Sequence, residues 1–216
     1  MKALLPPEVV VVEAFDDPPD AVLFPGEGEA LVKAVDRRRR EYTTVRHCAR
    51  QALADLGLPP AAIPTGPNRE PLWPAGVLGS LTHCDGYRAA ALARVGTVSS
   101  LGIDAEPHEP LPDEVLRTIA RPEERPRLKE LDSVRPDIHW NKVLFCAKES
   151  VYKAWFPLAH RWLGFEDASV RFAMSGAFDV ELHVPGPTVG DAVLTTMHGR
   201  WQVRNDLILT AVVVPA

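Results

Sequence analysis

The sequence lacks the features that mark several large classes of protein. Near the N-terminus there is only a four-valine run, residues 9–12, which is too short for a signal peptide or a membrane span. The three cysteines are far apart, and no CxxC pair occurs, so neither a disulfide framework nor a zinc site is indicated. These absences predict a cytoplasmic protein with reduced thiols.

Common nucleotide-binding and nucleophile motifs are absent as well. Neither GxxxxGK[ST] nor GxGxxG occurs, which removes the two commonest phosphate-binding loops. Ser80 follows Gly79 but does not stand in a GxSxG motif, so a hydrolase nucleophile elbow is not supported. The seven histidines show no metal-ligand spacing, and no repeat with a period of about 20–50 residues is visible.

What is present is the composition of an ordinary soluble globular protein. Hydrophobic residues make up 46% and charged residues 25% of the 216 positions, enough for one large domain or two small ones. The net charge of -5 argues against a general binder of nucleic acid or anionic membranes.

Hydrophobic spacing predicts helices and strands in both halves of the chain. Helices are expected at residues 27–56, 113–120 and 140–158. Strands are expected at residues 9–15, 77–82, 87–95, 100–104, 169–174, 178–184, 201–204 and 207–214. Two turns should join strands into hairpins, one at residues 84–86 and one at residues 205–206.

Proline-rich stretches divide these elements. Residues 59–74 should form a long loop, and residues 121–136 look charged and irregular. The link at residues 107–112 is the predicted boundary between an N-terminal half, 1–106, and a C-terminal half, 107–216. Each half reads as a helix packed on antiparallel strands, so the fold class is α+β with a hint of internal duplication.

The helix at residues 140–158 carries charges opposite an apolar face. Glu149 lies almost opposite that face, flanked by Lys142 and by Lys153, which is four residues further on. Pro157 is expected to end the helix. The ordinary interpretation is a solvated face with one ion pair. The side expected to be buried carries Val143, Leu144, Ala147, Val151, Ala154 and Trp155.

A second acidic group favours a functional interpretation over a solvated helix face. Asp104 and Glu106 point to the same face of an extended strand. With Glu149 they make three carboxylates, a hard oxygen site that suits Mg²⁺. Lys148 and Lys153 lie close enough in sequence to neutralise a bound pyrophosphate. Carboxylate pairs are also common on protein surfaces, so a structural role stays open at this point.

An arginine run at residues 37–40 sits in the first long helix. Arg38 and Arg46 are eight residues apart and share a face, so they could clamp a terminal phosphate. A solvated helix face or an RNA patch are the alternatives, although only Tyr42 offers stacking. His83, beside the first hairpin turn, could be structural or functional.

Three short motifs follow one another in the chain: residues 79–83 (GSLTH), 102–106 (GIDAE) and 145–154 (FCAKESVYKA). In this order they resemble the motifs of the 4'-phosphopantetheinyl transferases. The likeness is greatest to the longer, monomeric kind from actinobacteria, which activates polyketide, nonribosomal-peptide and siderophore synthases. It extends through residues 44–50 (TVRHCAR), 70–74 (EPLWP) and 162–168 (WLGFEDA), and covers the chain from about Arg37 onward.

The resemblance implies two similar α+β halves related by a pseudo-twofold, with coenzyme A between them. It implies Mg²⁺, with Mn²⁺ as the alternative, held by Asp104, Glu106 and Glu149 against the pyrophosphate. Asn68 stands where many relatives have lysine, so Arg69 is the expected substitute. The remaining coenzyme A contacts are expected from Arg38, Arg46, Glu70, Thr82, His83, Lys148 and Lys153.

The implied reaction moves the phosphopantetheine arm of coenzyme A to a serine of an acyl or peptidyl carrier protein and releases 3',5'-ADP. Glu149 is the candidate general base, and Lys153 would stabilise the leaving phosphate. The partners are carrier proteins, not nucleic acid or membranes, and the enzyme is expected to be a monomer. The alternatives are a metal-dependent phosphodiesterase or nuclease, and a non-catalytic coenzyme A sensor.

Overall fold

The computed structural model describes residues 1–216 in two compact units, Met1–Val98 and Ser99–Ala216. Both units combine helices with antiparallel strands, which confirms the α+β class. The structural division falls earlier in the chain than the link at residues 107–112. The functional boundary after residue 106 therefore stays a prediction.

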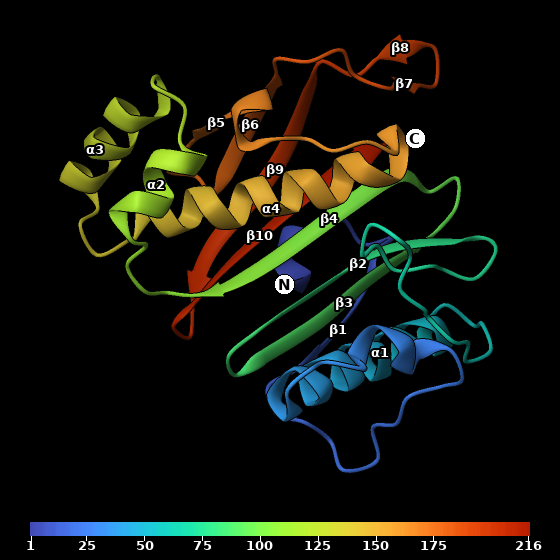
Figure 1. Cartoon of the computed structure of the whole chain (residues 1–216). Helices are drawn as coiled ribbons and strands as arrows, with labels where there is room; N and C mark the ends of the chain where they lie inside the picture. The colour runs from blue at the N-terminus through green and yellow to red at the C-terminus, as the bar shows by residue number, and fades with distance from the viewer. The chain divides into compact units, whose positions relative to one another are not determined.

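The first unit is a three-stranded sheet covered by one long helix. Its strands are β1 (Val10–Ala14), β2 (Val77–Cys84) and β3 (Tyr87–Arg94), in the antiparallel order β1-β3-β2. Helix α1 (Asp36–Asp55) packs on this sheet (Figure 1). The expected hairpin is confirmed, because β2 and β3 are joined through Asp85 and Gly86, and Gly86 has a φ of 68°.

The first long helix begins later than its hydrophobic spacing predicted. Residues 27–31 form a 3-10 turn, η2 (Glu27–Leu31), and α1 begins only at Asp36. Val35 between them is extended, with a ψ of 159°. The side chain of Glu27 is fully buried and bound to Arg50, which draws this turn onto the side of α1 instead of extending it. A further 3-10 turn, η1 (Lys2–Leu4), lies at the N-terminus.

The second unit is built on a five-stranded sheet in the order β4-β10-β9-β6-β5. Its strands are β4 (Val98–Pro107), β5 (Ala168–Phe172), β6 (Ala177–Leu182), β9 (Thr196–Arg204) and β10 (Leu207–Pro215). Two short strands, β7 (Thr188–Val189) and β8 (Ala192–Val193), form a separate hairpin. Asn205 and Asp206 make the expected turn between β9 and β10, with φ of 52° and 57°.

Helix α4 (Trp140–Ala159) lies along this sheet, with α2 (Asp113–Ile119) and α3 (Glu124–Val134) beside its N-terminal end (Figure 1). The prediction of an irregular segment at residues 121–136 was wrong. Pro126 is the third residue of α3, where the backbone N–H has no helical acceptor, so a proline there costs no hydrogen bond. Pro157 likewise does not end α4, which runs on to Ala159 and stops at His160 with a φ of 50°.

The core of the second unit lies between α4 and the sheet. All six residues expected on the apolar face of α4 are buried, together with Trp140, Cys146, Lys148, Ser150 and Phe156. The 3-10 turn η3 (Phe165–Asp167) follows α4 and leads into β5. In neither unit is a helix long and apolar enough to span a membrane.

Candidate functional site

The backbone of β4 touches α4 directly at Gly102. A Cβ added to Gly102 would lie 2.0 Å from the carbonyl oxygen of Ser150 and 2.6 Å from the backbone nitrogen of Ala154. Two residues earlier on the same face, the Ser100 hydroxyl donates a hydrogen bond of 2.7 Å to the Ala154 carbonyl. The next residue on this face is Asp104, so the close contact at Gly102 delivers Asp104 to the side of α4.

Both carboxylates of β4 reach lysines of α4. Oδ1 of Asp104 lies 2.6 Å from Nζ of Lys153, and Oε2 of Glu106 lies 3.3 Å from Nζ of Lys142. The Lys153 ammonium also donates to the Ile103 carbonyl at 3.2 Å. Asp104 is buried, with 5% of its surface exposed.

We call Asp104, Glu106 and Glu149 the acidic cluster. Burial raises the pKa of Glu149, and the negative charge of Asp104 raises it further. Glu106 behaves in the same way, because burial and then the charge of Asp104 raise its pKa. Burial lowers the pKa of Lys153, but the charge of Asp104 and their hydrogen bond outweigh this, so the pKa is raised overall. These shifts mean that the carboxylates repel one another in a partly buried site.

The acidic cluster has the donor chemistry for a hard divalent cation. Carboxylate oxygens are what Mg²⁺ and Mn²⁺ prefer, and two of the three carboxylates are destabilised in their charged form. No group of three or more His, Cys, Asp or Glu side chains is arranged as a coordination shell. Two of the carboxylates instead form ion pairs with lysine ammonium groups. The metal assignment of Asp104, Glu106 and Glu149 therefore stays a prediction.

Lys148 does not lie where a phosphate ligand was expected. Its side chain is buried, and Nζ lies 2.8 Å from Oε2 of Glu124. Nζ is also within hydrogen-bond distance of the carbonyls of Ile119, Phe165 and Ala168. An ammonium has three donors, and four acceptors surround it, so no donor is left for a phosphate. These contacts count against the prediction that Lys148 binds coenzyme A, which stays a prediction at this point.

The first unit holds most of the residues expected to bind the nucleotide. Arg38 is exposed on α1, but Arg46 is buried. Arg46 donates from Nε to the Ile63 carbonyl at 3.1 Å and from Nη2 to Oγ1 of Thr65 at 3.0 Å. Its guanidinium also stacks 3.2 Å from the ring centre of Tyr42, and burial lowers its pKa to about 10. Arg46 thus secures the loop at residues 59–74, whatever else it binds.

His83 and Thr82 lie at the end of β2 facing different surroundings. Nε2 of His83 is 3.6 Å from Oε2 of Glu41, a buried carboxylate on α1. Glu41 also accepts a hydrogen bond of 2.9 Å from Nε of Arg37. Thr82 is buried, with 2% of its surface exposed. Glu41 is not among the residues predicted from the sequence, although its spacing of four residues from Arg37 is a signal that could have identified it.

Arg69 and Glu70 lie in a tight turn of the loop. Arg69 is exposed and has a φ of 70°, which is unusual for a residue other than glycine. Glu70 folds back over this turn and accepts a hydrogen bond of 2.9 Å from the backbone N–H of Asn68. The Gly66 N–H donates 2.8 Å to the Glu70 carbonyl, which closes the turn. Arg69 is therefore held outward at the tip of the loop.

Two family models match the chain in succession. The 4'-phosphopantetheinyl transferase N-terminal domain matches residues 27–93, and the 4'-phosphopantetheinyl transferase superfamily matches residues 100–206.

Three characterised proteins illustrate the similarity. The chain is 47% identical over 212 residues to the 4'-phosphopantetheinyl transferase PptT of Mycobacterium tuberculosis, covering 96% of this chain and 92% of that protein. It is 48% identical to the 4'-phosphopantetheinyl transferase Svp of Streptomyces mobaraensis, covering 99% and 89%. Enterobactin synthase component D of Salmonella typhimurium is more distant, at 30% identity, covering 85% and 75%.

Proposed function

Because the chain belongs to the 4'-phosphopantetheinyl transferase superfamily, we propose that its acidic cluster is where coenzyme A gives up its phosphopantetheine arm. The enzyme transfers this arm to carrier proteins, and the proteins to which it is 47–48% identical are named 4'-phosphopantetheinyl transferases. What we propose beyond that is the role of each residue.

One observation supports this assignment above the others. Strand β4 and helix α4 touch at Gly102, and the carboxylate of Asp104 lies 2.6 Å from the ammonium of Lys153. Acidic and basic groups from two elements, 49 residues apart in sequence, thus meet in a partly buried place. Such a place can accept both a cation and a diphosphate, because each finds its counter-charge there.

In the proposed reaction, Glu149 takes the proton from the carrier serine while the serine oxygen forms a bond to the β-phosphorus. The bond from that phosphorus to the bridging oxygen breaks, and 3',5'-ADP leaves with the electron pair. The raised pKa of Glu149 makes it a stronger base than an ordinary carboxylate, which favours this role. Lys153 keeps 28% of its side chain exposed and stabilises the charge that develops on the departing phosphate.

A divalent cation, Mg²⁺ by preference, would be held by Asp104, Glu106 and Glu149. When bound, it supplies positive charge to the pyrophosphate. The nucleotide end of coenzyme A is assigned to Arg38, Arg46, Arg69, Glu70, Thr82 and His83. Arg38 and Arg69 are the exposed cations of this set, and so they are the strongest candidates for direct phosphate contacts. A cytoplasmic location and a monomeric state stay predictions from the sequence.

The experiment is to incubate the enzyme with coenzyme A, Mg²⁺ and an apo carrier domain, and to weigh the carrier by mass spectrometry. A mass gain of one phosphopantetheine is expected. The same reaction with Glu149→Gln should leave the carrier unmodified. Hydrolysed coenzyme A with an unmodified carrier would instead indicate a phosphodiesterase, and binding without turnover would indicate a sensor. Full transfer by the Glu149→Gln variant would contradict the base assignment.

A further inference from the structure

In each unit, a glutamate from outside the long helix is almost completely buried and is bound to a cation of that helix. In the first unit, Glu27 is fully buried, and Oε1 lies 2.8 Å from Nη1 of Arg50 on α1. In the second unit, Glu124 is 1% exposed, and Oε2 lies 2.8 Å from Nζ of Lys148 on α4. Buried charges need such partners, because an unpaired charge in the interior is very costly.

The Glu27–Arg50 pair of the first unit has a clear structural role. Glu27 accepts hydrogen bonds from the backbone N–H of Phe24, three residues before it, at 2.7 Å and from that of Ile63 at 2.8 Å. Arg50 donates to the Val22 carbonyl and stacks over the Phe24 ring at 4.2 Å. The pair fastens two distant segments to α1, and its contacts are all within the protein.

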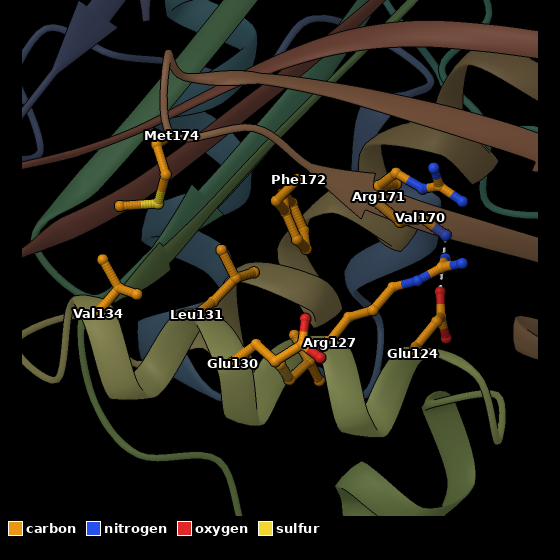
Figure 2. A pocket seen from close by; sticks show the side chains of 10 residues that line it. Glu124, Arg127, Glu130, Leu131, Val134, Val170, Arg171, Phe172 and Met174 are labelled. Carbon is orange, nitrogen blue, oxygen red and sulfur yellow. Dashed lines mark hydrogen bonds between the residues drawn. The ribbon is translucent and has the colours of Figure 1, made fainter.

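The Glu124–Lys148 pair repeats this arrangement. Glu124 accepts from the backbone N–H of Arg121, also three residues before it, at 2.7 Å, and from that of Val170 at 2.7 Å. Figure 2 shows Glu124 at the end of the groove between α3 and β5, with its hydrogen bond to Val170. The pair has the same three parts as the first one: an N–H three residues back, a distant N–H, and a helix cation.

The Glu124–Lys148 pair also closes part of the edge of the sheet. Strand β5 is the outermost strand, next to β6 alone. Lys148 donates to the carbonyl of Ala168, and Glu124 accepts from the N–H of Val170, two residues further along β5. Alternate residues of a strand turn their backbone groups to the same side. The two side chains therefore take the place of a neighbouring strand and connect β5 to α4.

We propose that Lys148 is a positioning residue for the transfer reaction and does not contact coenzyme A. It immediately precedes Glu149, and successive helical residues point about 100° apart. The ion pair with Glu124 holds Lys148 on one side of α4. It thereby fixes the rotation of the helix at which Glu149, on a different side, points toward Asp104. The inference rests on the proposed role of Glu149, but the placement of Lys148 can be tested separately.

The first test is a double-mutant cycle on the pair. Lys148→Met should lower the melting temperature and reduce kcat roughly tenfold to a hundredfold, as a misplaced catalytic group does, while the Kd for coenzyme A changes by less than about threefold. Adding Glu124→Gln should restore part of the melting temperature and part of kcat, because it removes the charge that Lys148→Met leaves unpaired and keeps an oxygen that can accept from a backbone N–H. A residue that binds phosphate would show no such rescue.

A matched control comes from the first unit. Arg50→Met should lower the melting temperature to a similar extent, and adding Glu27→Gln should restore part of it. Since this pair fastens segments of the first unit to α1, kcat at saturating coenzyme A should stay unchanged throughout. If this control loses stability but keeps its kcat, then a loss of kcat in Lys148→Met reflects the positioning of Glu149 and not reduced stability alone.

The second test uses the unaltered protein, so it holds even if a variant fails to fold. Amine acetylation followed by peptide mass spectrometry should leave Lys148 unlabelled, with or without coenzyme A, while exposed Lys129 is labelled. Labelling of Lys148 that coenzyme A prevents would overturn the proposal. So would a rise in the Kd for coenzyme A of roughly tenfold or more in Lys148→Met, the size of a lost charged hydrogen bond, without rescue by Glu124→Gln. Neither measurement requires transfer activity, so a result that overturns the role of Lys148 is distinct from a result that overturns the proposed reaction.

Discussion

The ammonium of Lys153 lies 2.6 Å from Oδ1 of Asp104 and brings a positive charge to the acidic cluster. In this position Lys153 offsets part of the repulsion among Asp104, Glu106 and Glu149. It also competes for Asp104 with any cation that binds there, because one carboxylate oxygen cannot hold both at close range.

The first prediction follows from this competition. Lys153→Met should reduce transfer at least about a hundredfold, since a charged group that stabilises the leaving phosphate is lost. The variant should also bind Mg²⁺ more tightly, so the rise in melting temperature on adding Mg²⁺ should exceed that of the unaltered enzyme. Thermal unfolding with and without Mg²⁺ is the measurement, and Lys129→Met is the control. An unchanged response to Mg²⁺ would show that Lys153 and the cation do not share Asp104.

Glu149→Gln gives the second prediction, in which activity and stability change in opposite directions. Transfer should fall about 10²- to 10⁴-fold, as expected when a general base is removed. The melting temperature at neutral pH should stay equal or rise, because the raised pKa of Glu149 means that its charge destabilises the folded state. Glu130→Gln, at an exposed position of α3, should change neither quantity. A clear loss of stability in Glu149→Gln would contradict the electrostatic account.

Gly102→Ala provides a third prediction at the contact between β4 and α4. The added methyl group would lie 2.0 Å from the Ser150 carbonyl oxygen, so α4 must move or the fold must loosen. We expect a loss of about 1–3 kcal/mol or more, as for other overpacked cores, and a melting temperature lower by about 2–4 °C for each kcal/mol. Transfer should fall as well, since Asp104 and Lys153 separate. Gly28→Ala, where a Cβ meets nothing within 4 Å, is the matched control.

Local patterns predicted the parts of the site that depend on a single element. The period of α4 placed Glu149 away from the apolar face, and the alternation of β4 placed Asp104 and Glu106 together, and both carboxylates do meet lysines of α4. Gly102 in the middle of a strand was an available signal for the close approach of another backbone.

Contacts between segments that are distant in the sequence could not be predicted from local patterns. The direction of the Lys148 side chain depends on Glu124, which lies in α3. This helix was not predicted, because prolines at residues 122, 126 and 136 made the segment look irregular. The start of α1 depends on Glu27 pairing with Arg50, 23 residues away. A long side chain on a helix can turn to solvent or inward, and only the partner decides between the two.

The fourth prediction compares Arg38 and Arg46 of α1, for which the sequence predicted the same phosphate-binding role. Arg46→Ala should lower both the melting temperature and the affinity for coenzyme A, because Arg46 is buried and holds Ile63 and Thr65. Arg38→Ala should weaken coenzyme A binding by a factor of roughly ten to a hundred, typical of a lost charged hydrogen bond, with little change in stability. Calorimetric titration and thermal unfolding give both quantities. Equal stability of the two variants would argue against the structural role of Arg46.

The fifth prediction concerns the three thiols, none of which forms a disulfide. Cys48 and Cys146 are fully buried, whereas Cys84 at the end of β2 is half-buried. Burial raises the pKa of Cys48 to about 11, and burial together with the charge of Asp104 raises the pKa of Cys146 well above its usual value. Since a raised pKa disfavours the reactive thiolate, only about 1% of Cys48 would be ionised even at about pH 9.

The native protein should therefore consume one equivalent of a thiol reagent at about pH 8, and the unfolded protein three. Cys84→Ser should remove the native reaction. The informative residue is Cys146, because its Sγ lies 3.3 Å from Oγ1 of Thr210 and so reports whether α4 stays seated on β10. Gly102→Ala, which pushes α4 from β4, should make Cys146 react without unfolding the first unit, leaving Cys48 protected. If Cys146 stays as inert as Cys48 in that variant, α4 has not moved, and any loss of transfer must come from a change within β4 itself.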